Sequence, residues 1–556
     1  MNLKPKLFSV MKKYTKEQFV KDVIAGIIVA IIALPLSIAL AIASGVSPER
    51  GIYTAIVAGF IIAFLGGSRV QVSGPTAAFA TIVGGIVATK GMDGLIVATV
   101  MAGIILVIMG LLKFGTIIKF IPYNITTGYT AGIAVTLLIG QLKDFFGLSV
   151  VSEEPLIETV DKLVYDVKFI NTFNVQAFLV GLLSLAILIV WPMIKRPGFL
   201  SKIPPSLIAV VVGILVVNGF KLNVNTIGNL YELSTDLPKF TLPHVDFPMV
   251  RDLLPNAFTI AVLAAIESLL SCVVSDSMIN SRHNSNMELV ALGTGNIASA
   301  LFGGIPATGA IARTTANVKN GGRTPIAGMV HAVVLLLVLV VLMPYAALIP
   351  MPTIAAILFM VAYNMSGWRT FVRLCKTAPK SDIIVLVLTF VLTVVFDLVV
   401  AIEVGMILTC VLFIKRMSEE TLVKGWKIVD DDNDPDSITL RKVPEKTMVY
   451  EVSGPMFFGA ADKILSITVS SEMNNLIIRM RSVNAVDSTA INALSALADR
   501  CEKENVRLIL SHVNEQPMNA LKKAGLYDKI GEKNFCKHID DALKAVEAEL
   551  ITDPSY

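Results

Sequence analysis

The sequence predicts a polytopic α-helical membrane protein of fourteen transmembrane segments, arranged as two inverted repeats of seven, followed by a small cytosolic α/β domain. Three observations predict this class. Only 16% of the 556 residues are charged, against about 25% in soluble domains, and mean hydropathy is +0.72. Apolar stretches long enough to cross or enter a bilayer recur up to about residue 415. Beyond that residue the chain becomes more polar, and strand-like and helix-like runs alternate.

Fourteen stretches are apolar enough to form membrane segments. A helix needs about 20 apolar residues to cross the hydrocarbon core of a bilayer. Some of the stretches are shorter than this, so we expect them to enter the membrane without spanning it as straight helices. The predicted segments are 20–43, 50–66, 72–89, 94–112, 122–142, 174–194, 204–219, 252–275, 287–303, 307–318, 324–343, 346–362, 381–397 and 399–415.

The distribution of Lys and Arg predicts how these segments are oriented. Cytosolic loops of membrane proteins carry an excess of both residues. The N-terminal segment 1–19 is basic, and so are the loops that follow even-numbered segments, such as 195–202 and 369–380, whereas the long loop 143–173 is rich in acidic residues. We therefore predict a multi-pass protein of the cell membrane with both termini in the cytosol.

Domain boundaries follow from the change in composition. We predict a cytosolic N-terminal segment at 1–19, a transmembrane transport domain at 20–415, a polar linker at 416–436 and a cytosolic domain at 437–556. Strand-like and helix-like runs alternate in the last of these, which is typical of an α/β domain. The strand-like runs are 438–443, 447–452, 475–480 and 506–511, and the helix-like runs are 459–470, 488–503, 515–524 and 538–550.

The third and tenth segments are interrupted by glycine and proline. The third opens with Ser73-Gly74-Pro75-Thr76-Ala77, and the tenth opens with Gly304-Ile305-Pro306-Ala307-Thr308-Gly309-Ala310. Proline inside a span removes a helical hydrogen bond and breaks or kinks the helix. Because fourteen segments divide into seven and seven, the two interrupted segments occupy matching places in the two halves. Paired breaks of this kind point to a binding site near the middle of the membrane in an inverted-repeat transporter.

The chemistry of two such breaks favours an anion. A helix that starts within the membrane leaves its first backbone N–H groups without partners and carries the positive end of its dipole there. Two such starts that face each other can bind an anion. Small residues such as Thr76, Ala77, Gly309 and Ala310 permit close approach. The alternative is that Gly and Pro only kink packed helices, as they do in many membrane proteins.

Two ionisable residues lie deep in predicted segments. Glu267 is in the middle of segment 252–275, and Ser271 lies one turn further along the same face. Intramembrane carboxylates mark ion and proton pathways, so Glu267 is a candidate proton- or cation-coupling group; alternatively, it is a protonated or hydrogen-bonded structural residue. Arg313 follows the second break by about one turn. It either stands beside the anion or extends its charged end to the cytosolic interface.

Several classes of function lack support in the sequence. There is no Walker motif and no nucleophile triad, the five histidines have no metal-ligand spacing, and the five cysteines show no paired spacing. We therefore predict no enzyme activity, no cofactor and no bound metal. Basic residues cluster in loops, which indicates membrane orientation and not nucleic-acid binding.

A set of motifs in fixed order resembles a known family. The motifs are Ser44 to Ala55, Ser73 to Ala77, Ile266 to Leu270, and Gly304 to Asn317 followed by Gly321 to Gly328. Together they resemble the SulP anion permeases, bacterial relatives of the sulfate permease and prestin group. The soluble tail, which contains Asp487-Ser488-Thr489-Ala490, resembles a STAS domain.

The resemblance implies a uracil-permease-like fold with core and gate domains, transport by an elevator-like motion and commonly a homodimer. It implies an anion site between the starts of the third and tenth helices. Many eukaryotic sulfate carriers have Gln after the proline of the first helix, whereas Pro35 is followed here by Leu36; Ser37 is then the polar contact from that helix. The substrate-binding positions that match are Ser37, Thr76, Ala77, Ala310, Ile311 and Arg313.

Two further expectations come from the resemblance. The acidic position of the family's eighth helix matches Glu267, where Glu resembles proton-linked members or those that carry sulfate or dicarboxylates, and Asp is found in sodium-coupled bicarbonate members. In STAS relatives among sporulation regulators, a hydroxyl residue at the matching helix start is phosphorylated, which makes Ser488 and Thr489 candidate regulatory phosphosites. Asp, Ser and Thr are also ordinary helix caps, so capping is the alternative.

These observations lead to one leading hypothesis. The chain takes up a small anion (sulfate, bicarbonate or a dicarboxylate) by secondary active transport, in symport with a proton or else with sodium. Glu267 and Ser271 are the predicted ion-coupling residues, and the tail is expected to regulate transport or to bind a cytosolic partner. The alternatives are an anion channel or exchanger, or a membrane sensor that signals through its tail.

Overall fold

The structure is a computed structural model, and it divides into two compact units, Met1–Ile407 and Leu408–Tyr556. The residues that it describes are 3–116, 122–151, 158–194, 203–396, 398–425, 442–470 and 472–552.

Each of the fourteen predicted segments coincides with a helix, and the third and tenth begin with a short strand. The helices are α2 (Lys16–Ala43), α3 (Pro48–Leu65), α4 (Ala80–Leu111), α5 (Tyr123–Gly140), α8 (Val175–Val190), α9 (Pro205–Gly219), α11 (Phe247–Ile279), α12 (Ser285–Leu301), α13 (Ile311–Lys319), α14 (Ile326–Ala346), α15 (Met351–Ser366), α17 (Lys380–Val395) and α18 (Leu398–Glu420). Shorter helices in the connections are α1 (Lys6–Val10), α6 (Leu142–Phe146), α7 (Thr159–Lys168), α10 (Ile227–Leu230) and α16 (Trp368–Thr377). Helix α4 covers the third and fourth segments and bends at Gly91, whose φ of 67° costs glycine little.

The lengths and compositions of these helices agree with the predicted membrane class. Among the described residues, eight helices are long and apolar enough to cross a bilayer. Helix α9 is apolar but shorter, and α13 is a helix of only 9 residues. The figure of fourteen spans therefore stays a prediction.

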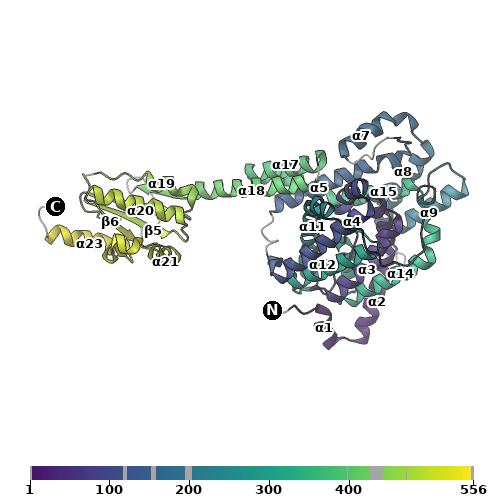
Figure 1. Ribbon diagram of the computed structural model, residues 1–556, viewed down its shortest axis with the longest axis horizontal. Coiled ribbons are helices and arrows are strands. Elements are labelled where there is room, and N and C mark those ends of the chain that lie inside the picture. Colours follow the sequence, from purple (N-terminus) through teal and green to yellow (C-terminus); the bar gives the residue numbers. More distant parts are fainter. Residues whose placement is uncertain are drawn as a thin grey trace. The chain divides into compact units, whose positions relative to one another are not determined.

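The helices of the first unit form two packed groups (Figure 1). One group contains α2, α3, α4, α11, α12 and α14, and the other contains α5, α8, α9, α15 and α17. Glycine allows α4 and α12 to approach closely: a Cβ added at Gly103 would lie 2.7 Å from the carbonyl oxygen of Gly293, and one added at Gly293 would lie 2.4 Å from the carbonyl oxygen of Gly103. Without an apolar–aqueous contrast between helices, close packing of this kind holds membrane helices together.

The second unit contains a five-stranded sheet in the order β3-β4-β5-β6-β7. Strand β3 is antiparallel to β4, and the other neighbours are parallel. The strands are β3 (Leu422–Gly425), β4 (Thr447–Ser453), β5 (Asn475–Ser482), β6 (Arg507–Ser511) and β7 (Phe535–Cys536), and the helices are α19 (Ala461–Leu465), α20 (Ser488–Lys503), α21 (Glu515–Lys523), α22 (Leu526–Ile530) and α23 (Ile539–Thr552). The predicted α/β domain is confirmed, and the run 438–443 lies mostly outside the described residues.

Helices cover both faces of this sheet because alternate residues of β5 point to opposite sides. Leu476 and Ile478 are buried with Leu494 of α20, whereas Ile477 is buried with Val546 of α23. The two apolar clusters give the domain a core of its own.

The first residues of the predicted linker 416–436 form regular structure. Helix α18 continues to Glu420 and β3 follows at once. Lys463 Nζ donates to the carbonyl oxygens of Ser418 at 2.7 Å and Thr421 at 2.6 Å, which satisfies carbonyls that a helix end leaves without partners. The rest of the predicted linker, 426–436, lies outside the described residues.

Candidate functional site

The two interrupted segments meet as a pair of antiparallel strands. Strand β1 (Ser73–Gly74) pairs with β2 (Thr308–Gly309), with Ser73 opposite Gly309 and Gly74 opposite Thr308. Side chains pack closely against both glycines of this contact: a Cβ added at Gly74 would lie 2.1 Å from Arg313 Nη1, and one added at Gly309 would lie 2.2 Å from Gln71 Nε2. The breaks that sequence symmetry placed in matching positions are thus side by side.

A helix begins directly after each strand. A 3-10 turn at Ala77–Phe79 follows Thr76 and leads into α4, and α13 follows Ala310. Neither Thr76 nor Ala310 makes a side-chain cap hydrogen bond. The first N–H groups of both helices are therefore without a capping side chain, and both helices present their positive dipole ends to the same place.

Arg313 brings a positive charge to this crossing. Its side chain is 2% exposed, and Nη2 donates to the carbonyl oxygen of Pro75 at 2.9 Å. The other terminal nitrogen, Nη1, is buried and has no hydrogen-bond partner among the described residues. The sequence left two alternatives open for Arg313: a position beside the anion, or a side chain extended to the cytosolic interface. Its burial beside the strands supports the first.

Glu267 faces the same crossing from α11. Thr76 Oγ1 donates to Glu267 Oε2 at 3.1 Å, and both residues are partly exposed. Ser271, one turn along α11, is buried and donates to Thr314 Oγ1 at 3.3 Å. The carboxylate and Ser271 thus bond to different strand–helix junctions, Glu267 to the third helix and Ser271 to the tenth.

The remaining predicted contacts are placed as follows. Ala77 is buried, Ala310 is partly exposed at the residue before α13, and Ile311 is 45% exposed at the start of α13. Ser37 is fully buried in α2, and its Oγ has no partner among the described residues. A Cβ added at Gly51 of α3 would lie 2.0 Å from the Ser37 carbonyl oxygen, so α2 and α3 are in tight contact there.

Sequence reasoning missed the side chains that hold the strands in place. Ser268 Oγ lies 2.7 Å from Thr308 Oγ1 and accepts a hydrogen bond from the Gly309 N–H at 2.9 Å. Glu288 accepts hydrogen bonds from Gln71 Nε2 and from the N–H groups of Gly67 and Ser68, at 2.7–2.9 Å. A carboxylate near the start of an otherwise apolar segment was the available signal for Glu288; Ser268 differs in the sequence in no way from other serines of α11.

The predicted phosphosite lies at the start of α20. Asp487 is the cap: its Oδ1 accepts from the Ala490 N–H at 2.8 Å, and its Oδ2 accepts from the Phe458 N–H at 2.8 Å. Ser488 and Thr489 are exposed. The capping alternative thus applies to Asp487, and the two hydroxyl groups point to the surface of the domain.

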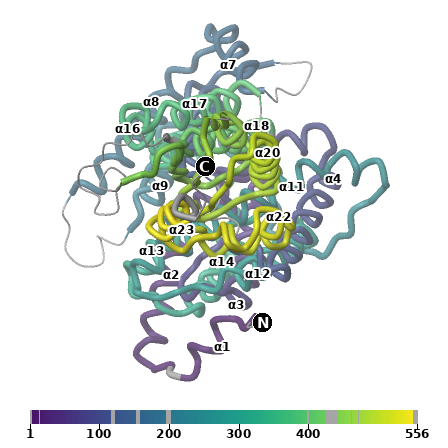
Figure 2. Tube along the Cα trace, turned by 90° about the vertical axis from the view of Figure 1, so that its left-hand side faces the viewer, coloured from purple at the N-terminus to yellow at the C-terminus, as the bar shows by residue number. Residues whose placement is uncertain are grey.

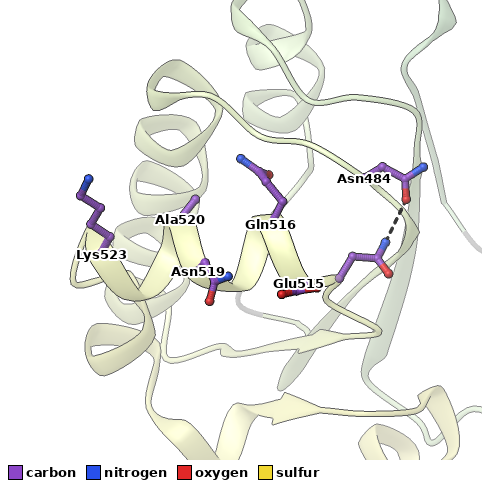
Figure 3. A pocket seen from close by; sticks show the side chains of 7 residues that line it. Asn484, Glu515, Gln516, Asn519, Ala520 and Lys523 are labelled. Carbon is purple, nitrogen blue, oxygen red and sulfur yellow. Dashed lines mark hydrogen bonds between the residues drawn. The ribbon is translucent and has the colours of Figure 1, made fainter. Parts of the chain in front are cut away.

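A pocket beside α21 includes Asn484, which precedes the Asp487 cap by three residues (Figure 3). Two of its side-chain amides are bonded to the backbone of this domain. Gln516 bonds both the N–H and the carbonyl oxygen of Val486, and Asn514 donates to the carbonyl oxygen of Val483. The pocket is lined by Asn484, Asn514, Glu515, Gln516, Asn519, Ala520 and Lys523. These bonds fix the loop that leads into Asp487.

The crossing can bind and position a negatively charged group but offers little for other chemistry. It combines uncapped helix starts, one buried guanidinium and one carboxylate. No group of three or more His, Cys, Asp or Glu side chains arranged to hold a metal is found in the described part of the chain.

Comparison with known proteins assigns both parts of the chain to known families. A family model described as the sulfate permease family matches residues 19–389. The chain belongs to the sulfate permease family. A STAS domain model matches residues 439–542, so the predicted resemblance to SulP permeases with a STAS tail is confirmed. As a member of this family, the protein is an anion transporter.

Similar proteins span nearly the full length of the chain. YvdB of Bacillus subtilis (strain 168), whose name marks it as a candidate sulfate transporter, is 40% identical over 536 residues, which cover 95% of this chain and 98% of YvdB. The bicarbonate transporter BicA of Picosynechococcus sp. is 30% identical over 540 residues, 94% of each protein. A solved structure of SLC26A9 matches with a TM-score of 0.86 at 20% sequence identity, covering 98% of this chain and 93% of that one, which supports the fold.

Proposed function

We propose that this protein takes up a small dianion or monoanion (sulfate, bicarbonate or a dicarboxylate) by secondary active transport. One observation carries the proposal: two uncapped helix starts and a buried Arg313 with an unpartnered Nη1 meet at the β1–β2 crossing. Backbone N–H groups and a guanidinium are the donors that suit a carboxylate, sulfate or bicarbonate oxygen. The predicted contacts of the anion are Thr76, Ala77, Ala310, Ile311 and Arg313, with Ser37 from α2.

We propose that Glu267 couples the binding of a proton to the binding of the anion. Its carboxylate bonds Thr76, which is itself a proposed substrate contact, so a change of charge at Glu267 reaches the anion through one side chain. A proton on Glu267 would remove a negative charge beside an arriving anion, which couples the two binding events because each makes the other more favourable. Ser271 supports the same region of α11 through Thr314.

The motion, the assembly and the role of the tail are further parts of the proposal. The two packed groups of helices in the first unit suit the core and gate of an elevator-type carrier, with the β1–β2 crossing in the group that contains α4 and α11. We expect a homodimer with both termini in the cytosol. The STAS domain would regulate transport or bind a cytosolic partner, with Ser488 or Thr489 as the candidate phosphosite.

Uptake by purified protein in liposomes tests the proposal. Labelled sulfate, bicarbonate and fumarate are offered separately, each with an imposed proton gradient, a sodium gradient or neither. We expect accumulation above equilibrium of one anion class when the interior is alkaline. Equilibration without accumulation under every gradient would contradict active transport and favour a channel.

The Glu267→Gln variant tests the coupling residue. We expect it to abolish the dependence of uptake on the proton gradient, because the neutral amide keeps the bond to Thr76 but cannot release a proton. The matched control is Glu17→Gln, which neutralises an exposed carboxylate paired with Lys21. Unchanged accumulation driven by the proton gradient in Glu267→Gln would refute the coupling role and leave the anion site intact.

A further inference from the structure

A cavity of about 480 Å³ lies at the end of α2 that is remote from the basic N-terminal segment. Its lining comes from the end of α2 and from residues 80–88 of α4 on one side, and from residues 136–144 and α7 on the other. Figures 1 and 2 both place α7 far from α1 in this unit. The loop 143–173, which contains α7, is predicted to be external, so the cavity lies on the expected outer side.

The cavity lies next to the region of the proposed anion site. Ala80 and Thr81, which line it, follow the 3-10 turn Ala77–Phe79 directly. The two walls belong to different groups of packed helices, since α2 and α4 are in one group and α5 is in the other. An anion that approaches the β1–β2 crossing from outside would therefore pass between these walls.

Four charged side chains line the cavity without pairing. They are Lys143, Asp144, Lys162 and Asp166, and Asp166 is only 8% exposed. Within the described ranges, none of the four forms an ion pair or a side-chain hydrogen bond. Lys143 is exposed and Asp144 and Lys162 are partly exposed, so these charges can reach water or an ion in the cavity, and the buried charge of Asp166 is costly without a partner. The uncharged polar lining is Thr81, Thr136, Gln141 and Tyr231.

Asp166 titrates within the range that an external medium covers. Burial raises the pKa of Asp166 to about 6, with the charge of Asp144 acting in the same direction and those of Lys143 and Lys162 in the opposite one. Burial likewise raises the pKa of Asp144 and lowers the pKa of Lys162. When the external pH falls below about 6, Asp166 becomes protonated and the cavity loses one negative charge.

We propose that this cavity is an outer binding site where the transported anion is held before it reaches the β1–β2 crossing, and that Asp166 weakens this binding when it is charged. The inference rests on the proposed anion uptake. Lys143 and Lys162 attract the anion, and the carboxylates of Asp144 and Asp166 oppose them. External acid therefore raises the affinity for the anion independently of any proton that is carried across the membrane.

The experiment compares Asp166→Asn with Asp161→Asn. Both lie on α7, but Asp161 is exposed and does not line the cavity. Uptake by the full chain is measured in right-side-out membrane vesicles, with KM and maximal rate determined at external pH 5.5 and 7.5. Sulfate or fumarate is used for the pH comparison because bicarbonate itself changes charge in this range; all three labelled anions are compared at pH 7.5.

We expect Asp166→Asn to lower KM at pH 7.5 by about 3- to 10-fold, the effect of removing one charge at roughly 10 Å across a partly hydrated cavity. The difference in KM between the two pH values should largely disappear, while the maximal rate keeps its pH dependence. Lys162→Gln should raise KM. A general loss of folding would not lower KM in one of these variants and raise it in the other. Asp161→Asn should behave as the wild type.

The outcomes separate this inference from the function on which it rests. If the wild type accumulates none of the three anions, the proposed function fails and the outer site fails with it. If the wild type transports an anion and Asp166→Asn and Lys162→Gln both leave KM and its pH dependence unchanged, only the outer site is overturned.

Discussion

At the start of the third helix, β1 leads into a 3-10 turn, and Thr76 bonds the carboxylate of Glu267. At the start of the tenth helix, β2 leads into regular α-helix, and the charged side chain in the first turn is the cation Arg313. The backbones follow the same plan, and each start lacks a side-chain cap. The side chains differ, so that the third helix meets the group proposed to couple ions and the tenth supplies a positive charge.

The anchoring of the two strands differs as well. Strand β2 is fixed from α11 and α12, because Gly309 donates to Ser268 Oγ and Ala307 donates to Asn296 Oδ1. On the other side, Gln71 is also held from α11 and α12, by Cys272 and Glu288, but the N–H of Val72 donates to Thr314 Oγ1 of the tenth helix itself. The comparison teaches that two backbone starts of the same plan can carry side chains of different charge, with different proposed roles. The following predictions test that asymmetry.

Arg313→Gln should have the largest effect on transport. The change removes the guanidinium charge and weakens the bond to Pro75, and hydrogen bonds to charged groups contribute about 1.5–3 kcal/mol. We expect KM for the anion to rise about 10- to 100-fold. Kinetics of uptake in liposomes give the measurement. An unchanged KM would show that the positive charge of the tenth helix is structural.

Gly74→Ala should impair uptake by a different route. The added Cβ would meet Arg313 Nη1, so the guanidinium must move from its place beside β1. We expect KM to rise about tenfold and the free energy of unfolding to fall by about 1–3 kcal/mol. The matched control is Gly219→Ala, where a Cβ would meet nothing within 4 Å. Equal behaviour of the two variants would contradict the close contact at the crossing.

Thr76→Val should affect the third-helix side alone. It removes the hydroxyl that bonds Glu267 and keeps the shape of the side chain. We expect KM to rise about two- to tenfold, in line with the loss of one hydrogen bond of about 0.5–1.5 kcal/mol, and the dependence of uptake on internal and external pH to change. Thr377→Val, at an exposed threonine of α16, is the control. If affinity for the anion falls and the pH dependence stays the same, Thr76 contacts the anion but takes no part in ion coupling.

Ser268→Ala should have the smallest effect on transport. The substitution leaves the Gly309 N–H without its partner on α11, while the Thr308 hydroxyl keeps its bond to the carbonyl oxygen of Ala264, so we expect the free energy of unfolding to fall by about 1–3 kcal/mol. KM should stay within about twofold of the wild type. Thermal unfolding in detergent and uptake kinetics test the two parts. A large rise in KM with normal stability would show that Ser268 contacts the anion.

Sequence by itself determined the membrane class, the α/β tail and the two interrupted segments. These follow from composition and local pattern, because a span needs a long apolar run and a break needs residues such as Gly74 and Pro306, whatever surrounds them. Symmetry of the two halves also indicated that the breaks would lie together. The contacts of Lys463 with the end of α18 could not be predicted from local pattern, since they join residues more than 40 apart.

Only the tertiary structure decided which side chains meet. The bond from Thr76 to Glu267, the placement of Arg313 against Gly74 and the gathering of Asp166 with Lys143 around one cavity each join different helices. A local pattern gives the face on which a residue lies, but not the helix that packs against that face. The physical reason is that such contacts depend on how helices distant in sequence turn and approach one another, and this is set by packing over the whole unit.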